Sequence, residues 1–276
     1  MDLPLHEALG LTRPAVFATV GGGGKTTVLF ALAAEWEAAD GMDAVGGLTV
    51  LTTTTRMTIP REGRTLPLAI GRDDAFRAGA LDDIRSRGRS SAVVGSGRGD
   101  RERVLAVDPS WPRQVVDAGL ASLVGVEADG SRGRPFKAPA PHEPIIPEGV
   151  DVVAAVIGAG VLGRPLDERS VHRPEIVAEI AGAEIGDEVT PELAARVMMS
   201  PEGGRKGVPK SAEFVVLVSG AGRALEGSRA LASAVGGKVV LWDAGSGVLE
   251  RSGPGVSSEK RPGSQHEAQT NGEADA

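Results

Sequence analysis

One segment near the N-terminus combines the residue types that bind the phosphates of a nucleotide. It reads Gly21, Gly22, Gly23, Gly24, Lys25, Thr26 and Thr27. Glycines let backbone N–H groups come close to an anion, and a helix that starts at the lysine adds partial positive charge. The lysine would reach the terminal phosphates, and the hydroxyl of Thr26 can ligate Mg²⁺. The spacing therefore predicts binding of ATP or GTP together with Mg²⁺.

This predicted phosphate loop is shorter than the common pattern, which has a further glycine five residues before Gly24. The chain has Thr19 at that position. The shortened form, Gly-x-x-Gly-Lys-Thr-Thr, is of the sort seen in ATP-dependent amide ligases. The alternative is a flexible glycine turn with a solvated lysine, but an apolar β-type run before the loop and helical spacing after it favour nucleotide binding.

Two carboxylates follow an apolar run further along the chain, at Glu127 and Asp129. While the strand continues, residues at alternate positions project to the same side. Nucleotide hydrolysis needs a carboxylate at a strand end that holds Mg²⁺, directly or through water. We predict that Asp129, or else Glu127, holds the metal with Thr26, that the other carboxylate orients water or substrate, and that both are catalytic together with Lys25. Two solvated turn residues are the alternative.

A proline-rich segment after these carboxylates could present charged groups to a substrate. Prolines fix its backbone and lower the entropy cost of holding side chains in one geometry. A second group lies just before a helix expected from Pro174. An anionic substrate or a second phosphate would suit these cations, although each alone could be a solvated surface charge. The candidate substrate-binding residues are Arg132, Lys137, His142, Glu143, His172 and Arg173.

Strand-like and helix-like segments alternate along the chain, which predicts an α/β fold with a mostly parallel, doubly wound, P-loop NTPase-like sheet. Strands are expected at residues 16–20, 48–51, 92–94, 104–107, 123–126, 152–157, 214–218 and 238–242. Helices are expected at residues 25–39, 112–118 and 174–181, and after Thr190, which precedes a proline as an N-cap would. One domain should cover residues 1–250. Residues 251–276 form a polar tail without apolar periodicity, for which no packed structure is expected.

The composition limits the range of functions. A formal charge of −7 disfavours nucleic acid as a partner. The absence of cysteine excludes disulfides, thiolate metal sites and a selenium carrier that uses a thiol. The N-terminal residues do not look like a signal peptide, and the longest apolar stretch, residues 152–162, is too short to span a membrane. We therefore expect a soluble, cytoplasmic protein.

Taken together, these motifs resemble the YqeC family, whose members are described as accessory proteins of selenium-dependent molybdenum hydroxylases. The resemblance covers most of the chain up to about Trp242. It is carried by residues 20–27, 52–57, 127–131, 137–139, 142–144 and 171–174.

The resemblance implies a nucleotide-binding protein that helps to mature or insert a selenium-containing molybdenum cofactor, with the hydroxylase apoenzyme or its cofactor as partner. An Mg²⁺-dependent NTPase is the leading interpretation. A non-catalytic nucleotide or cofactor sensor that acts as a chaperone is an alternative, and a ligase-like ATP-dependent enzyme is another. Residues 219–222 read Ser-Gly-Ala-Gly, where related chains tend to have Asn and Asp, so both ATP and GTP stay open.

Overall fold

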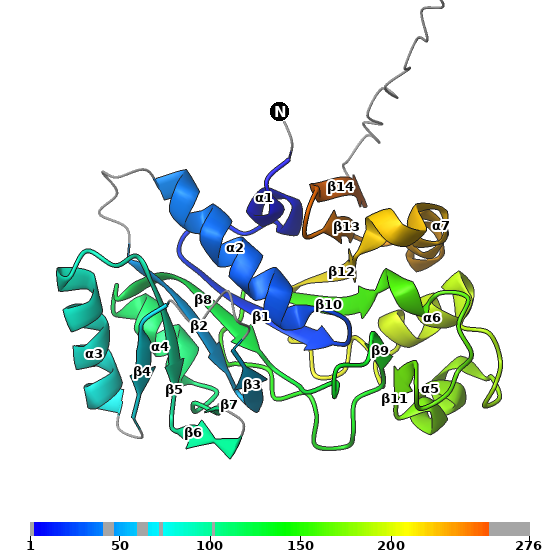
Figure 1. Cartoon of the computed structure of the whole chain (residues 1–276), viewed down its shortest axis with the longest axis horizontal. Coiled ribbons are helices and arrows are strands. Elements are labelled where there is room, and N and C mark those ends of the chain that lie inside the picture. The colour runs from blue at the N-terminus through cyan, green and yellow to red at the C-terminus, as the bar shows by residue number, and fades with distance from the viewer. Residues whose placement is uncertain (1–2, 41–46, 60–65, 72–73, 101–102, 254–276) are drawn as a thin grey trace, which may run out of the picture.

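The structure is a computed structural model that describes residues 3–40, 47–59, 66–71, 74–100 and 103–253. Its centre is a nine-stranded sheet in the order β14-β13-β12-β10-β1-β8-β2-β5-β4 (Figure 1). These strands are β1 (Ala15–Gly21), β2 (Leu48–Thr53), β4 (Leu68–Ile70), β5 (Ser91–Gly95), β8 (Ala121–Glu127), β10 (Val152–Gly158), β12 (Glu213–Ser219), β13 (Val239–Asp243) and β14 (Gly247–Ser252).

Neighbouring strands of this sheet are parallel except for the terminal pair β13 and β14, which is antiparallel. The central strands are continuous runs of small and branched apolar residues, and every residue of β8 and β10 is buried. Such runs suit strands that are covered on both faces. The predicted α/β class with a mostly parallel sheet is confirmed, and the arrangement is consistent with a P-loop NTPase-like fold.

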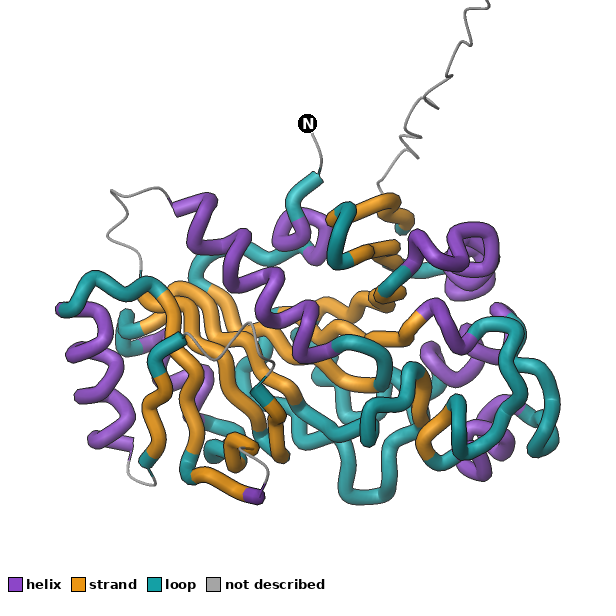
Figure 2. The backbone as a smooth tube through the Cα atoms, in the orientation of Figure 1, coloured by secondary structure: helices purple, strands orange, loops and turns teal. Residues whose placement is uncertain are grey.

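Helices cover both faces of the sheet (Figure 2). The described helices are α1 (Leu5–Leu9), α2 (Lys25–Asp40), α3 (Asp74–Ser86), α4 (Trp111–Asp117), α5 (Pro174–Ala181), α6 (Pro191–Met199) and α7 (Leu225–Val235). On one face, α1 and α2 pack around the buried Trp36 and Phe17. The other helices contribute to the core on the opposite face. As expected, Thr190 caps α6, because its hydroxyl accepts a hydrogen bond from the Leu193 N–H at 3.2 Å.

Two small sheets are formed by segments that follow strands of the main sheet. One contains β3 (Arg56–Thr58), β6 (Arg98–Gly99) and β7 (Arg103–Leu105), and the other pairs β9 (Phe136–Lys137) with β11 (Val171–His172). Of residues 104–107, predicted as a strand, only 104 and 105 lie in a strand, and that strand, β7, belongs to a separate antiparallel sheet. Strand β7 pairs with β3 and β6 in antiparallel fashion and is not part of the nine-stranded sheet.

Several elements were not predicted. The sequence reasoning missed α1, α3, α7, β4 and β14, which are short or have mixed polar and apolar residues. Strand β14 continues to Ser252 by pairing with β13, so the predicted tail starts inside a strand. Residues 254–276 of that tail lie outside the described residues.

The order of the strands explains where a site can form. Strand β1 lies between β8 and β10, so the connection from β8 to β10, residues 128–151, must pass the carboxyl end of β1. We call residues 128–151 the crossover segment. In open α/β sheets, ligands bind where neighbouring connections diverge at the carboxyl ends of strands. The crossover segment and the turn from β1 to α2 meet at such a place.

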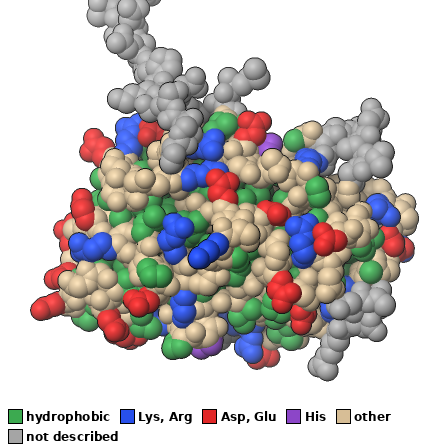
Figure 3. All heavy atoms as spheres, turned by 180° about the vertical axis from the view of Figure 1, so that it is seen from behind, with side chains coloured by type: hydrophobic (Ala, Val, Ile, Leu, Met, Phe, Trp, Pro, Cys, Tyr) green, Lys and Arg blue, Asp and Glu red, His purple; other side chains and the backbone are tan. Residues whose placement is uncertain are grey.

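The face shown in Figure 3 gives little sign of a partner that requires a surface of one charge. Acidic and basic side chains are interspersed on the face shown in Figure 3, without a continuous basic stripe. Within the described residues, no helix has both the length and the apolar character required to cross a bilayer.

Candidate functional site

The turn between β1 and α2 is closely surrounded by other backbone segments. Gly23 and Gly24 have φ values of 75° and 98°, in the left-handed region that favours glycine. A Cβ atom on Gly23 would lie 2.2 Å from the backbone nitrogen of Gly158, and one on Gly22 would lie 2.7 Å from the carbonyl oxygen of Arg134. Larger residues would therefore push the loop away from β10 and from the crossover segment.

The backbone N–H groups of this turn fall into two sets. Those of Gly22 and Gly23 donate to carbonyl oxygens of β10 and the crossover segment, at 2.9 and 3.1 Å. That of Gly21 donates to a carboxylate at 2.9 Å. In the described part of the chain, the N–H groups of residues 24–27 have no acceptor. The donors open to an anion are thus those at the N-terminus of α2, whereas the first three glycines hold the loop in place.

Lys25 is folded back over the loop. Its side chain is only 3% exposed, and its Nζ donates to the carbonyl oxygen of Gly21 at 2.6 Å. The same nitrogen lies 3.2 Å from Oδ1 of Asp129. An ammonium group has three donors, so this lysine uses two of them and has one left.

Thr26 faces the other carboxylate. Its hydroxyl donates to Oε2 of Glu127 at 2.5 Å, and the backbone carbonyl of Glu127 accepts a 2.7 Å hydrogen bond from the hydroxyl of Thr53 on β2. Burial raises the pKa of Glu127 above its usual value, and nearby Lys25 and Thr26 oppose that rise. A hydroxyl and a carboxylate side by side provide the oxygen ligands that Mg²⁺ prefers.

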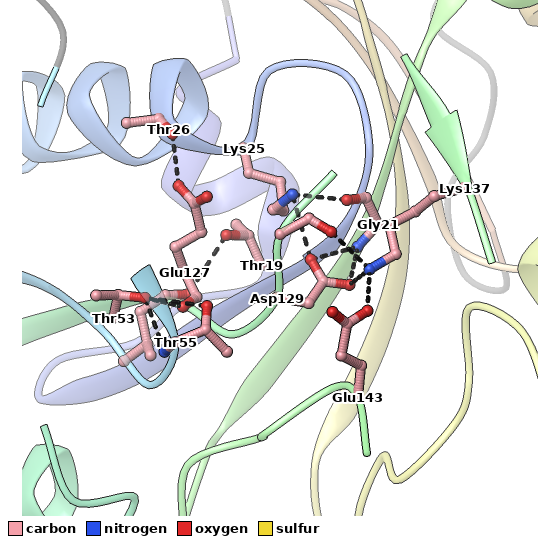
Figure 4. Close-up of polar contacts among 12 residues, drawn as sticks. Thr19, Gly21, Lys25, Thr26, Thr53, Thr55, Glu127, Asp129, Lys137 and Glu143 are labelled. Atoms are coloured by element: carbon pink, nitrogen blue, oxygen red, sulfur yellow. Dashed lines mark hydrogen bonds and ion pairs between the residues drawn. The ribbon is translucent and has the colours of Figure 1, made fainter. Parts of the chain in front are cut away.

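Asp129 is held by three donors at the end of β8 (Figure 4). Its carboxylate accepts from the Gly21 N–H and pairs with Lys25, and Nζ of Lys137 lies 3.1 Å from Oδ2. Only 2% of the Asp129 side chain is exposed. The predicted pairing of Thr26 with Asp129 as metal ligands stays a prediction, while the contacts place Glu127 directly against Thr26.

Charges of alternating sign continue from Asp129 toward α5. Lys137 is completely buried, and its Nζ donates to Glu143 at 2.6 Å. Arg173 donates to both oxygens of Glu143, at 2.8 and 3.2 Å. Partial burial would raise the pKa of Glu143, but the hydrogen bonds from Arg173 and Lys137 outweigh it and lower the pKa to about 2. We call Lys25, Asp129, Lys137, Glu143 and Arg173 the ion chain.

Two of the remaining candidate residues, Arg132 and His172, lie near the ion chain. Arg132 is exposed, and His172 is partly buried beside it. Arg132 and Arg173 are the two described non-glycine residues with positive φ, at 52° and 63°. Such conformations are uncommon and often occur at functional sites. His142 is exposed, and within the described chain no hydrogen bond or ion pair joins it to the ion chain.

We expect His172 to carry a neutral imidazole at neutral pH. Partial burial lowers its pKa, and Arg173, Lys137 and Arg132 lower it further, to about 4. Because the folded pKa lies below the ordinary 6.5, the resulting stabilisation is present above pH 6.5 and is lost as pH falls toward 4. An NMR titration of the imidazole should show a midpoint near 4, and Arg132→Ala should raise it. Arg98→Ala, on an exposed residue of β6, should not change it, and a wild-type midpoint at or above 6.5 would contradict this geometry.

A small cavity of about 10 Å³ lies beside Asp129 and Lys137. It has room for about one water molecule. Among the described residues, no group of three or more His, Asp or Glu side chains could hold a metal by itself. A metal at Thr26 and Glu127 would therefore need further ligands from phosphates and water, as is usual for Mg²⁺.

Sequence reasoning missed two groups that shape the loop. The hydroxyl of Ser219, at the end of β12, donates to the carbonyl oxygen of Gly23. The carbonyl of Arg134 accepts from the Gly23 N–H, so this residue supports the loop through its backbone. The position of Ser219 at a strand end was a usable signal, but nothing in the local pattern around Arg134 indicates a backbone contact 111 residues away in the sequence (134 − 23).

Comparison with known proteins places these residues in a family. The sequence model described as YqeC protein matches residues 17–175, which is more than half of the chain. The chain belongs to the YqeC family. An Escherichia coli K12 protein whose name is "Uncharacterized protein YqeC" is 32% identical over 209 residues, covering 75% of this chain and 76% of that protein. No solved structure gives a significant match.

The part that matches the YqeC family contains nearly the whole candidate site. The predicted phosphate loop, both carboxylates and the ion chain from Lys25 to Arg173 lie within residues 17–175, whereas Ser219 lies beyond them. The structure places Thr26 against Glu127 and Lys25 against Asp129, and Lys137 and Glu143 connect Asp129 to Arg173.

Proposed function

We propose that this member of the YqeC family binds a nucleoside triphosphate with Mg²⁺ and hydrolyses it. One observation carries the proposal: the open N-terminus of α2 lies beside Lys25 and Thr26, with two buried carboxylates next to them. Free N–H groups at a helix start attract phosphate, and a lysine and a hydroxyl at that start provide the remaining groups.

The residues present fit a nucleotide and Mg²⁺. The N–H groups of residues 24–27 and the spare donor of Lys25 would hold phosphate oxygens. Thr26 and Glu127 would hold the metal, which supplies positive charge that offsets the charge on the phosphates. Asp129, held by two lysines, keeps Lys25 oriented over the loop. Hydrolysis would be supported by the positioning of these groups rather than by a covalent intermediate.

We further propose that hydrolysis serves the maturation of a selenium-dependent molybdenum hydroxylase or its cofactor. This step rests on the family resemblance carried by the crossover segment. The partly exposed Arg173 at the end of the ion chain and the exposed Arg132 nearby would suit an anionic group on that cofactor. Because the chain has no cysteine, selenium would have to travel on another carrier.

The direct test is calorimetric titration with ATP and GTP, with and without Mg²⁺, together with a phosphate-release assay. We expect saturable binding that Mg²⁺ strengthens, and phosphate release faster than in protein-free controls. Binding without release above the control would instead identify a nucleotide sensor. If neither nucleotide binds, the proposed function is wrong.

Glu127→Gln should weaken the response to Mg²⁺. The substitution keeps the size of the side chain and a hydrogen-bond acceptor for Thr26 but removes the negative charge. Loss of a metal-orienting group typically costs about 10–100-fold in metal affinity or activity. The Mg²⁺ concentration for half-maximal phosphate release should rise by roughly this factor, whereas Glu179→Gln on the exposed face of α5 should behave as wild type. An unchanged Mg²⁺ dependence would remove Glu127 from the metal site.

A further inference from the structure

The carboxylate of Asp129 occupies a place that would also suit a phosphate. Two ammonium groups, from Lys25 and Lys137, and the N–H of Gly21 all converge on it. Side-chain exposure is 3% for Lys25, 2% for Asp129 and 0% for Lys137, so water competes little for these contacts. Two lysines and a backbone N–H make a typical set of phosphate donors, and here an internal acid is bound to them.

Among the partners of the two lysines, Asp129 makes the longest contacts. Lys25 lies 2.6 Å from the carbonyl oxygen of Gly21 but 3.2 Å from Asp129. Lys137 lies 2.6 Å from Glu143 and 2.8 Å from the carbonyl oxygen of Gly130, but 3.1 Å from Asp129. Shorter charge-assisted hydrogen bonds are the stronger ones. An arriving anion would therefore displace Asp129 before it displaces the other partners.

The donors of Lys137 lead to the same result. All three are in use, by the carbonyl oxygen of Gly130 and by the carboxylates of Glu143 and Asp129. A phosphate can therefore reach Lys137 only by displacing one of these partners, and Asp129 is the most distant of them.

We infer that Lys25 and Lys137 form a two-lysine clamp for the terminal phosphate of a nucleoside triphosphate, and that Asp129 occupies this clamp while no nucleotide is bound. The inference rests on the proposed function and makes it more specific. Lys25, at the start of α2, would hold inner and terminal phosphates. Lys137 comes from the crossover segment and would contact the terminal phosphate alone, so it distinguishes a triphosphate from a diphosphate.

The rest of the ion chain positions Lys137. Glu143 binds its ammonium group, and Arg173 fixes both oxygens of Glu143. The carbonyl of Gly130 takes a further donor. Once Asp129 has moved away, these contacts would keep Lys137 pointing at the same position. The clamp is thus held in place before the nucleotide arrives, which lowers the entropy cost of binding.

The test compares the affinities for ATP and ADP, and for GTP and GDP, by calorimetry in Mg²⁺-free buffer with EDTA. The main variant is the double substitution Lys137→Gln with Glu143→Gln, which removes one charge of each sign, because loss of Lys137 alone would leave Asp129 and Glu143 with one cationic partner each. Lys206→Gln is the matched control. This lysine also binds the crossover segment, through the carbonyl oxygens of Ala140 and Pro141. Within the described residues, no hydrogen bond or ion pair joins it to Asp129.

We expect the double variant to lose about tenfold or more of its preference for triphosphate, the effect of about one charge-assisted hydrogen bond, with diphosphate affinity nearly unchanged. The Lys206 control should keep the wild-type preference. Asp129→Asn should raise triphosphate affinity several-fold, because an amide competes more weakly for the two lysines.

The outcomes separate this inference from the proposed function. An unchanged triphosphate preference in the double variant, in a protein where Lys25→Ala weakens nucleotide binding, would show that Lys137 is only structural and would overturn the clamp. If Lys25→Ala also has no effect, the proposed function itself is wrong. If melting curves show that the double variant is unfolded, the Asp129→Asn variant provides the test. A triphosphate affinity equal to or weaker than that of wild type would contradict the proposed role of Asp129 and overturn the clamp.

Discussion

Lys25→Ala is expected to reduce the affinity for ATP or GTP by about 100-fold and to remove phosphate release. Hydrogen bonds to charged groups contribute about 1.5–3 kcal/mol each, and each 1.4 kcal/mol corresponds to about tenfold in affinity. Loss of one bond to a phosphate oxygen at the upper end of that range gives the expected factor. Calorimetry with wild type and variant under identical salt measures it directly.

This variant should still fold, which makes its effect on binding interpretable. Asp129 keeps Lys137 and the Gly21 N–H as partners when Lys25 is removed. Lys210→Ala is a suitable control, because this lysine is exposed in the loop before β12. A folded Lys25→Ala protein with wild-type nucleotide affinity would mean that the turn between β1 and α2 is not the phosphate site.

Glu143→Ala is expected to destabilise the fold by about 3 kcal/mol. Removing one partner of a buried ion pair typically costs about 3–5 kcal/mol because the other charge is left without compensation. Here the group left behind is Lys137, which is completely buried and retains only Asp129 as a charged partner. For a protein of this size the loss corresponds to a fall of roughly 6–12 °C in melting temperature. Urea unfolding at neutral pH, with unchanged m-values, would measure the free energy.

A second ion pair in the chain provides the control. Glu213 and Lys238 are also 2.6 Å apart, but 45% of the Glu213 side chain is exposed. Exposed pairs contribute about 0–1 kcal/mol, so Glu213→Ala should have a much smaller effect. Equal losses of stability in the two variants would contradict the claim that burial makes the contacts of the ion chain more stabilising than exposed ion pairs.

The contribution of Glu143 to the free energy of unfolding should depend on pH. The pKa of Glu143 is about 2 in the folded protein and about 4.5 when unperturbed. Its contribution to stability is therefore present above pH 4.5 and lost as pH falls toward 2. The difference between wild type and Glu143→Ala should shrink across this interval.

Local patterns were enough to predict the elements that carry the site. Val16 to Val20 followed by glycines and a lysine specify a strand, a tight turn and a helix, and that unit is present as β1 and α2. Long apolar runs such as residues 152–157 identified the buried strands, because only strands covered on both faces are apolar throughout. Thr190 before Pro191 identified the start of α6 by the same kind of local chemistry.

What the sequence could not predict depends on contacts between distant segments. Nothing near Lys137 in the sequence indicates that it is completely buried between Asp129 and Glu143, since an isolated lysine is nearly always exposed. Likewise, Glu127 and Asp129 differ by two positions, yet one faces Thr26 and the other faces Lys25 and Lys137. That division of roles follows from the placement of β8 beside β1, which no periodicity encodes.

The insertion of β8 and β10 on either side of β1 has a consequence for biosynthesis. A ribosome makes the glycine loop early, but Val156, whose carbonyl oxygen receives the Gly22 N–H, follows more than 130 residues later. Arg173, which secures Glu143, is made later still. Nascent chains that stop before β10 would contain the loop and both acids without the backbone that shapes them. Nucleotide capture should therefore be acquired late in translation, after most of the sheet has been synthesised.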